Sequence, residues 1–178
     1  MQTQLECIME IKNDTIIQIV GLKPGSYAYK ILLDGAFFSR YENDDFSDGE
    51  VVFEVIVEKT AQSTVINLDF KGTVKGTCDR CLGEMAIPVE GKGALLVKFG
   101  EEADSDNEDT IVIPSDATSI DLAQWMYEYV IVSLPMQRMH PEDQCDPEMV
   151  KYLHKESDEP EQKEIDPRWE VLKQLKEE

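Results

Sequence analysis

Two neighbouring stretches decide the fold, VVFEVIV at residues 51–57 and TVINLDFKGTV at residues 64–74. The first is nearly continuous in β-branched and aromatic residues, which is typical of a central strand. The second places the apolar residues Ile66, Leu68 and Phe70 at every second position. A period of two indicates a half-buried strand, so we expect the even-numbered side chains to face a core.

Further stretches of strand composition lie on both sides of these two. They are separated by Gly, Pro and Asp turn signals and comprise residues 15–20, 27–33, 85–89 and 94–99. After the turn signal Asp34-Gly35, the pair Phe37-Phe38 resumes an apolar stretch. Short strands joined by such turns favour antiparallel pairing. The sequence therefore predicts an antiparallel β-sheet or a partly closed barrel over about residues 1–100.

The composition changes after residue 100. Residues 101–109 contain six acidic side chains in nine positions and predict a solvated loop. The segment 121–134 then has helical periodicity, with Asp121 as N-cap and Pro135 after its end. We expect this helix to pack on the sheet through the apolar residues Leu122, Trp125, Met126 and Tyr129. Together these features predict an α+β protein, with one mainly antiparallel domain over residues 1–135 and helices in the C-terminal half.

Residues 136–178 read as an acidic, partly irregular extension. One short helix is expected near residues 148–153. Asp166-Pro167 is a good helix start, and the residues after it form a narrow apolar stripe of Trp169, Leu172 and Leu175. This terminal helix is expected to dock either on the core or on a partner.

The composition bounds the class of protein. The 178 residues are 42% hydrophobic and 30% charged, which suits one ordinary globular domain. The first fifteen residues have neither a basic nor an apolar region of a secretory signal, and no apolar run approaches the ~20 residues of a spanning helix. We therefore expect a cytoplasmic protein without membrane contact, in which cysteines are reduced or bind metal.

The net charge of −20 excludes a surface that coats nucleic acid nonspecifically. Most of the acidic excess lies after residue 100, whereas residues 59–98 carry a small basic excess. An acidic protein can still present one basic face. The candidate RNA-contacting side chains in this region are Lys71, Lys75, Arg80, Lys92 and Lys98.

The sequence CDRC at residues 78–81 has the form of a zinc knuckle between two strands. A second half-site, His140 and Cys145, follows the predicted helix. Since Zn²⁺ takes about four nitrogen or sulfur ligands, Cys78, Cys81, His140 and Cys145 would form a closed structural site. Two alternatives remain open, free thiols at a hairpin end and a redox CxxC pair. The redox pair is disfavoured, because such pairs open a helix in a βαβ unit.

The motifs of nucleotide-binding loops and of serine hydrolases are missing, and two histidines suggest no acid–base pair. We therefore expect no catalytic residues and no small-molecule substrate. A metal-dependent hydrolase would need an open coordination position, which a site with four protein ligands lacks.

Several short motifs together carry a family resemblance. CDRCL at 78–82, IDL at 120–122 and SLP at 133–135, followed by His140 and Cys145, have the order and spacing of the bacterial YceD family, which this sequence resembles over most of its length. The resemblance implies a non-enzymatic ribosome-biogenesis factor that supports maturation or accumulation of 23S ribosomal RNA.

Two modes of action are compatible with that resemblance. In the first, the basic side chains contact 23S ribosomal RNA or its precursor through phosphates. In the second, the acidic half binds a basic ribosomal protein or an assembly factor, and effects on RNA are indirect. The lysines would then be ordinary solvent-face and strand-edge charges, which guard against aggregation.

Overall fold

The computed structural model describes residues 6–19, 21–61, 63–99, 110–114, 116–141 and 144–154. The predicted loop 101–109 and the predicted terminal helix after Asp166 lie outside the described residues. Among the described helices, none is long and apolar enough to cross a bilayer.

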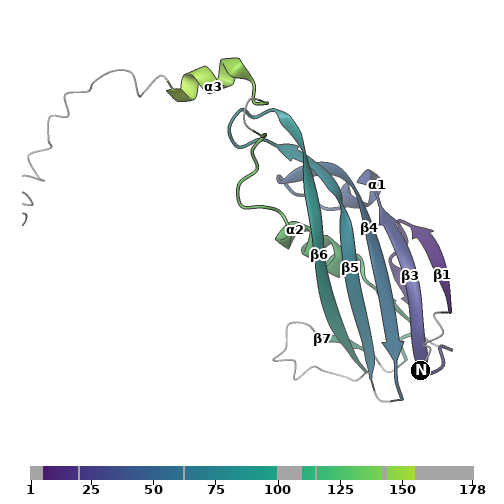
Figure 1. The fold of residues 1–178 in the computed structure, drawn as a ribbon. Coiled ribbons are helices and arrows are strands. Elements are labelled where there is room, and N and C mark those ends of the chain that lie inside the picture. Colours follow the sequence, from purple (N-terminus) through teal and green to yellow (C-terminus); the bar gives the residue numbers. More distant parts are fainter. Residues whose placement is uncertain are drawn as a thin grey trace, which may run out of the picture.

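The centre of the molecule is a six-stranded sheet in the order β1-β3-β4-β5-β6-β7. Its strands are β1 (Glu6–Lys12), β3 (Gly25–Leu33), β4 (Phe46–Lys59), β5 (Thr64–Thr77), β6 (Glu84–Phe99) and β7 (Thr110–Ile113). The four central strands pair antiparallel, and the edge strands β1 and β7 pair parallel with β3 and β6. The sheet is open, so the antiparallel prediction is confirmed and the barrel alternative is wrong (Figure 1).

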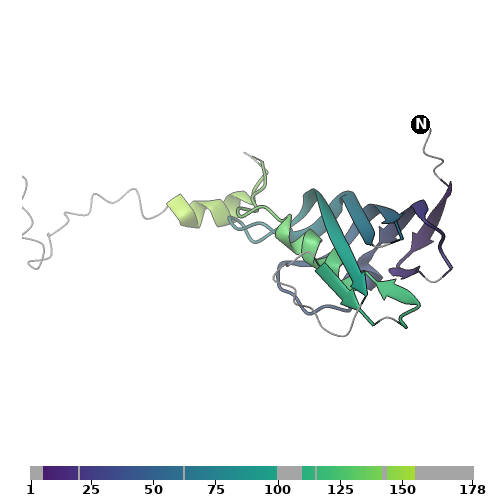
Figure 2. The ribbon, with the colours of Figure 1, turned by 90° about the horizontal axis from the view of Figure 1, so that it is seen from below.

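Smaller elements cover one face of this sheet. They are α1 (Gly35–Phe38), α2 (Ala123–Val132) and a two-stranded sheet of β2 (Ile16–Gln18) and β8 (Ser119–Asp121). The view along the strands shows these elements on the same side of the sheet, with the other face open (Figure 2). The fold is therefore α+β, as the sequence predicts, although α1 comes early in the chain, where an apolar continuation at Phe37-Phe38 was expected.

The core lies between the sheet and this cover. Ile66, Leu68 and Phe70 of β5 are buried as their alternation predicts, and they lie beside the buried residues Phe53 and Val55 of β4. β6 runs unbroken through Gly91, where two separate strands were expected. A Cβ atom at Gly91 would lie 2.7 Å from Cζ of Phe70, so the missing side chain makes room for this ring in the core.

The predicted helix 121–134 is shorter in the structure, since α2 spans Ala123–Val132. The N-cap residue is Leu122 and not Asp121, which belongs to β8. Asp121 Oδ1 nevertheless accepts a hydrogen bond from the N–H of Ala123 at 2.9 Å, as well as one from Thr15 Oγ1 at 2.6 Å. Leu122 and Met126 are fully buried, as expected. Trp125 and Tyr129 also pack against the core, as expected, but they are only half-buried.

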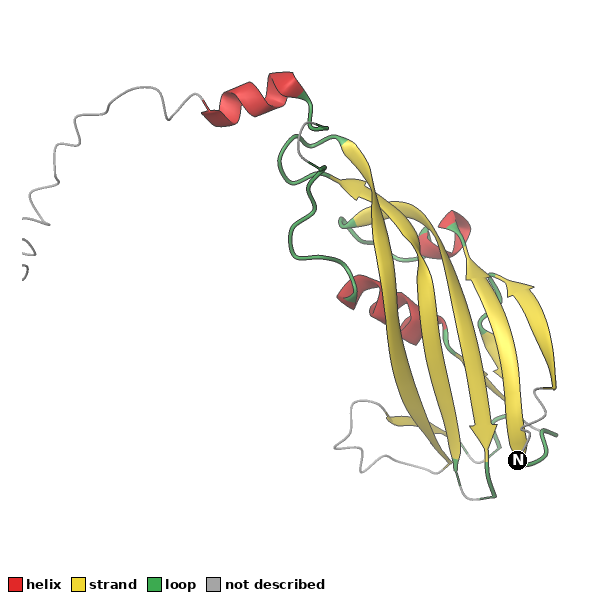
Figure 3. Cartoon of the chain, in the orientation of Figure 1, coloured by secondary structure: helices red, strands yellow, loops and turns green. Residues whose placement is uncertain are grey.

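β5 and β6 are the longest pair and extend beyond their neighbours to a hairpin tip. The chain leaves α2 at Ser133 and runs up to this tip. It then forms α3 (Pro147–His154), the short helix expected near residues 148–153, which projects away from the sheet (Figure 3). The tip therefore joins two parts of the chain that are about sixty residues apart in sequence.

Candidate metal centre

The turn that joins β5 to β6 is formed by residues 78–83. The backbone N–H of Cys78 donates to the carbonyl of Gly83 at 2.8 Å, and the N–H of Leu82 donates to the carbonyl of Cys78 at 2.9 Å. Leu82 has φ 57°, the left-handed conformation that reverses the chain after the second cysteine. This tight turn directs both sulfur atoms to one side.

Four ligand atoms meet beside this turn. The Sγ atoms of Cys78, Cys81 and Cys145 and a ring nitrogen of His140 all lie within 4.8 Å of one another. The three cysteines are buried, and His140 is half-buried. The structure thus brings together both halves of the ligand set that the sequence suggests.

Two of the distances between these atoms match those around a tetrahedral zinc ion. Zn–S bonds of about 2.3 Å and Zn–N bonds of about 2.0 Å place two sulfurs about 3.8 Å apart and a sulfur and a nitrogen about 3.5 Å apart. The distance from Cys78 Sγ to Cys145 Sγ is 3.9 Å, and that from Cys81 Sγ to His140 Nδ1 is 3.4 Å. Three sulfurs and an imidazole suit zinc and not magnesium or calcium, which prefer oxygen ligands.

Backbone amides prepare two of the thiols for a cation. Burial raises the pKa of Cys78, but the N–H groups of Cys81, His140 and Arg80 outweigh it and lower this pKa to about 6. The N–H groups of Asp146 and Gly83 likewise lower the pKa of Cys81. The site therefore favours thiolates, the form that binds a metal ion.

The other two ligands, Cys145 and His140, lie in different surroundings. Burial raises the pKa of Cys145, so this thiol gives up its proton only to a metal or at high pH. The His140 Nε2 atom lies 3.2 Å from the carbonyl oxygen of Glu84. A carbonyl only accepts, so Nε2 donates this bond and Nδ1 faces the sulfurs, the usual arrangement of a ligating histidine. The hydrogen bond with Cys81 raises the pKa of His140, so a metal ion would take the place of a proton on Nδ1.

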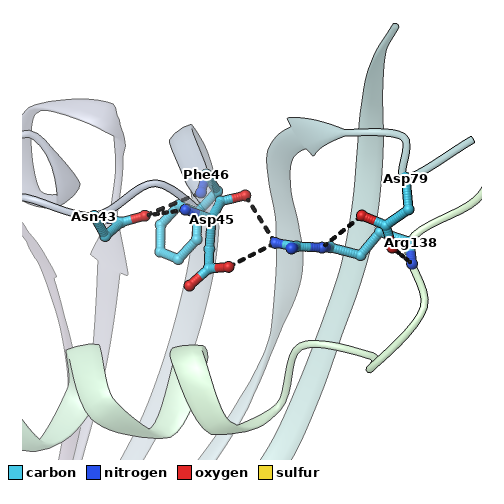
Figure 4. A network of polar contacts seen from close by, with 5 residues as sticks. All are labelled: Asn43, Asp45, Phe46, Asp79 and Arg138. Atoms are coloured by element: carbon cyan, nitrogen blue, oxygen red, sulfur yellow. Dashed lines mark hydrogen bonds and ion pairs between the residues drawn. The ribbon is translucent and has the colours of Figure 1, made fainter. Parts of the chain in front are cut away.

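Arg138 fastens the ligand loop to the hairpin (Figure 4). Its backbone N–H donates to Asp79 Oδ2 at 2.7 Å, while its carbonyl accepts from the N–H of Asp79 at 2.6 Å. Its guanidinium reaches Asp45 Oδ1 at 2.8 Å and Asp79 Oδ1 at 3.7 Å. Since Arg138 is only two residues from His140, this half-buried ion-pair network positions the second half-site.

The five basic candidates do not form one patch. On the open face of the sheet, Lys71 pairs with Glu90, Lys75 with Asp48 and Lys92 with Asp69. The other two lie at opposite ends of this region. Arg80 is in the hairpin turn, where its Nη2 atom contacts Met139 Sδ at 3.7 Å, and Lys98 is exposed near the far end of β6.

Arg138, Asp45 and Asp79 are not among the site residues that the sequence predicts. A signal existed for Asp79, since it lies inside CDRC, and for Arg138, since it closely precedes His140. Asp45 gives no such signal, because it comes from the loop before β4 and reaches Arg138 only through the fold.

The fold and the cluster define an α+β protein with an open, mostly antiparallel sheet and a candidate Cys3His centre at its tip. A family model described as the large ribosomal RNA subunit accumulation protein YceD matches residues 66–176, more than half of the chain. The chain belongs to the YceD family. The match includes β5, β6, α2 and all four candidate ligands. No curated protein and no solved structure matches the chain.

Proposed function

We propose that this chain is a non-catalytic, cytoplasmic factor that supports the accumulation of 23S ribosomal RNA in the large ribosomal subunit. Membership of the YceD family is the observation that carries this proposal. The absence of catalytic motifs in the sequence supports a role in binding.

In this role, Cys78, Cys81, His140 and Cys145 would bind one structural zinc ion. Four protein ligands complete a tetrahedral shell, which leaves no position for a catalytic water. The ion would hold the loop after α2 against the β5–β6 hairpin. Its role is therefore to shape the tip and not to carry out a reaction.

Binding to RNA is the first way in which such a protein could act. Of the five basic side chains, three already have carboxylate partners on the open face. These exposed ion pairs contribute little stability and can exchange for phosphates. Contact with RNA through Lys71, Lys75, Arg80, Lys92 and Lys98 thus stays a prediction.

Binding to a basic ribosomal protein or an assembly factor is the second way. The net charge of −20 favours it, because this charge repels the phosphates of RNA and attracts basic proteins over a Debye length of about 8 Å at physiological salt. In this mode the effect on ribosomal RNA is indirect.

A binding experiment separates the two modes. The zinc-loaded protein is titrated with a fragment of 23S ribosomal RNA and, separately, with purified large-subunit proteins, at several salt concentrations. Salt-dependent binding to the RNA alone supports direct contact, and the reverse pattern supports the protein partner.

If RNA binds, charge reversal at Lys71, Lys75 and Arg80 should lower the salt slope by about 1 for each lost phosphate contact. An unchanged slope would contradict the basic face.

A further inference from the structure

The cluster that forms the candidate metal centre also brings two sulfur atoms from distant parts of the chain into contact. Cys78 Sγ lies 3.9 Å from Cys145 Sγ, although the two residues are 67 positions apart in the sequence. Both thiols are free, and both side chains are buried. The sulfurs of a disulfide are about 2.05 Å apart, so this distance would have to shorten by about 2 Å. A shared metal ion and a covalent bond are therefore two alternative ways to join these residues.

The segment around Cys145 permits this approach. Residues 144–146 belong to neither a helix nor a strand, so a small shift of Cys145 breaks no ladder of hydrogen bonds. Cys78 and Cys81, in contrast, share one tight turn that two backbone hydrogen bonds close. Cys81 Sγ also contacts His140 Nδ1 at 3.4 Å. The geometry therefore favours a bond between Cys78 and Cys145 over one within the CxxC pair.

Exposure sets the order in which an oxidant meets the sulfurs. Cys145 is 8% exposed and Cys81 is 4% exposed, whereas Cys78 is fully buried. A small oxidant such as hydrogen peroxide therefore reaches Cys145 before Cys78. A sulfur that binds zinc is a thiolate, and the thiolate is the form of cysteine that peroxides oxidise. Cys145 is thus placed to be oxidised first, with Cys78 behind it as the second thiol.

We propose that the cluster is also a peroxide-sensitive redox pair, in which Cys78 and Cys145 form a disulfide and the site gives up its zinc ion. In the first step, the Cys145 thiolate attacks one peroxide oxygen. The S–O bond forms, the O–O bond breaks and hydroxide leaves, so the sulfur has lost two electrons and is a sulfenic acid. In the second step, the Cys78 thiolate attacks this sulfur. The S–S bond forms, the S–O bond breaks and a second hydroxide leaves.

This redox role goes beyond support of ribosomal RNA, but it rests on the zinc site of the proposed function. After oxidation, only Cys81 and His140 remain of the four ligands, which is too few for a structural zinc site. The link between the hairpin and the loop is kept, because Cys78 lies at the β5–β6 turn and Cys145 lies between α2 and α3. Oxidation therefore unloads the metal without detaching the loop from the hairpin.

Peptide mapping of the full-length, zinc-loaded chain after treatment with hydrogen peroxide tests the proposal. Tryptic cleavage at lysine and arginine places the three cysteines on separate peptides, residues 76–80, 81–92 and 139–151. Each possible disulfide therefore has its own mass once the remaining thiols are alkylated. We expect peptide 76–80 to be joined to peptide 139–151. About two thiols and about one zinc ion per chain should be lost in parallel, and a reductant with added zinc should reverse both losses.

Variants separate this pair from the other possible pairs. Cys81→Ser should still form the bond between Cys78 and Cys145, whereas Cys145→Ser should form no bond between the hairpin and the loop. Cys7→Ser is the matched control and should react as the wild-type chain does, since Cys7 lies on β1. A bond between Cys78 and Cys81 in the wild-type chain, a bond between two chains, or zinc that stays bound in excess peroxide would overturn the proposal.

The zinc content before oxidation distinguishes this inference from the proposed function. A chain that contains no zinc at the outset contradicts the structural zinc site and, with it, the release of zinc. A chain that contains zinc but forms no bond between Cys78 and Cys145 contradicts the redox inference alone. Circular dichroism confirms that each variant is folded, and none of these measurements depends on the ribosomal role.

Discussion

Asp34 shows how one carboxylate links the edge strand to the rest of the sheet. It accepts from Lys12 Nζ at 2.9 Å, from Asn13 Nδ2 at 2.7 Å and from the N–H of Ala36 at 2.9 Å. The hydrogen bond from Lys12, followed by that from Asn13, outweighs desolvation and lowers the pKa of Asp34 from 3.8 to about 2. The carboxylate of Asp34 therefore joins the end of β1 to the start of α1.

The sign of this pKa shift predicts an acid-sensitive contribution to stability. Because the pKa of Asp34 is lower in the fold than in the unfolded chain, the contacts stabilise the fold above about pH 4 and lose effect as the pH falls towards about 2. Asp34→Asn should lower the free energy of unfolding at pH 7 and flatten its decline over that interval. Urea unfolding at a series of pH values measures both, and an unchanged acid limb would contradict the assignment.

The metal ligands are the second residue-scale prediction. Wild-type protein purified without chelator should contain about one zinc ion per chain, and Cys145→Ser should lose most of it. Cys7→Ser is the matched control and should keep the zinc, since Cys7 lies on the edge strand β1, which β3 and β4 separate from the β5–β6 hairpin. Elemental analysis decides the matter. Free thiols, the alternative, would leave all three proteins without metal.

The extent of burial sets how much each side chain of α2 contributes to the stability of the protein. Met126 is fully buried, so Met126→Ala should destabilise the protein by about 2–5 kcal/mol. Val132 on the same helix is 82% exposed, so Val132→Ala should change stability by less than about 0.5 kcal/mol. Trp125→Ala should lie between the two, because Trp125 is half-buried. Denaturant unfolding gives the three values. Equal costs for Met126 and Val132 would mean that α2 is packed differently.

The strands show what the sequence can and cannot predict. β4 and β5 can be predicted from local patterns, because the composition and the alternation of their own residues indicate a strand and its buried side. The parallel pairing of β1 and the strand β8 were not expected, since β1 pairs with residues of β3 about twenty positions further along the chain and β8 is three residues long. Both depend on contacts between distant parts of the chain, which no local pattern encodes. The four candidate ligands were predicted because their spacing is a local signature, whereas Asp45 joins the site only through tertiary contact with Arg138.

Substitution of Arg138 tests how strongly the ligand loop depends on the contacts with Asp45 and Asp79. Arg138→Ala removes the guanidinium that reaches Asp45 and Asp79, so the loop is less well positioned before metal binds. Zinc affinity, measured by competition with a chromophoric chelator, should fall about 10–100-fold. Arg80→Ala, in the same hairpin turn but with Met139 as its side-chain partner, should have a much smaller effect. Similar losses of zinc affinity in both variants would mean that the removal of a positive charge, and not of these particular contacts, causes the effect.

On the scale of the whole molecule, the sheet acts as a scaffold that carries a shaped tip. Three lysines of the open face form ion pairs with carboxylates, and the acidic excess lies mainly in the second half of the sequence. The candidate zinc ion would join this second half to the β5–β6 hairpin. We therefore expect recognition of a ribosomal partner to depend on the tip and on the integrity of the four ligands.

The proposed role in the accumulation of 23S ribosomal RNA is tested most directly in cells. The measurement is the ratio of mature 23S to 16S ribosomal RNA in cells that lack the gene, with and without a copy that encodes this chain. We expect the ratio to fall on deletion and to be restored by the wild-type chain. An unchanged ratio in the deletion strain, under conditions in which the protein is normally present, would contradict it.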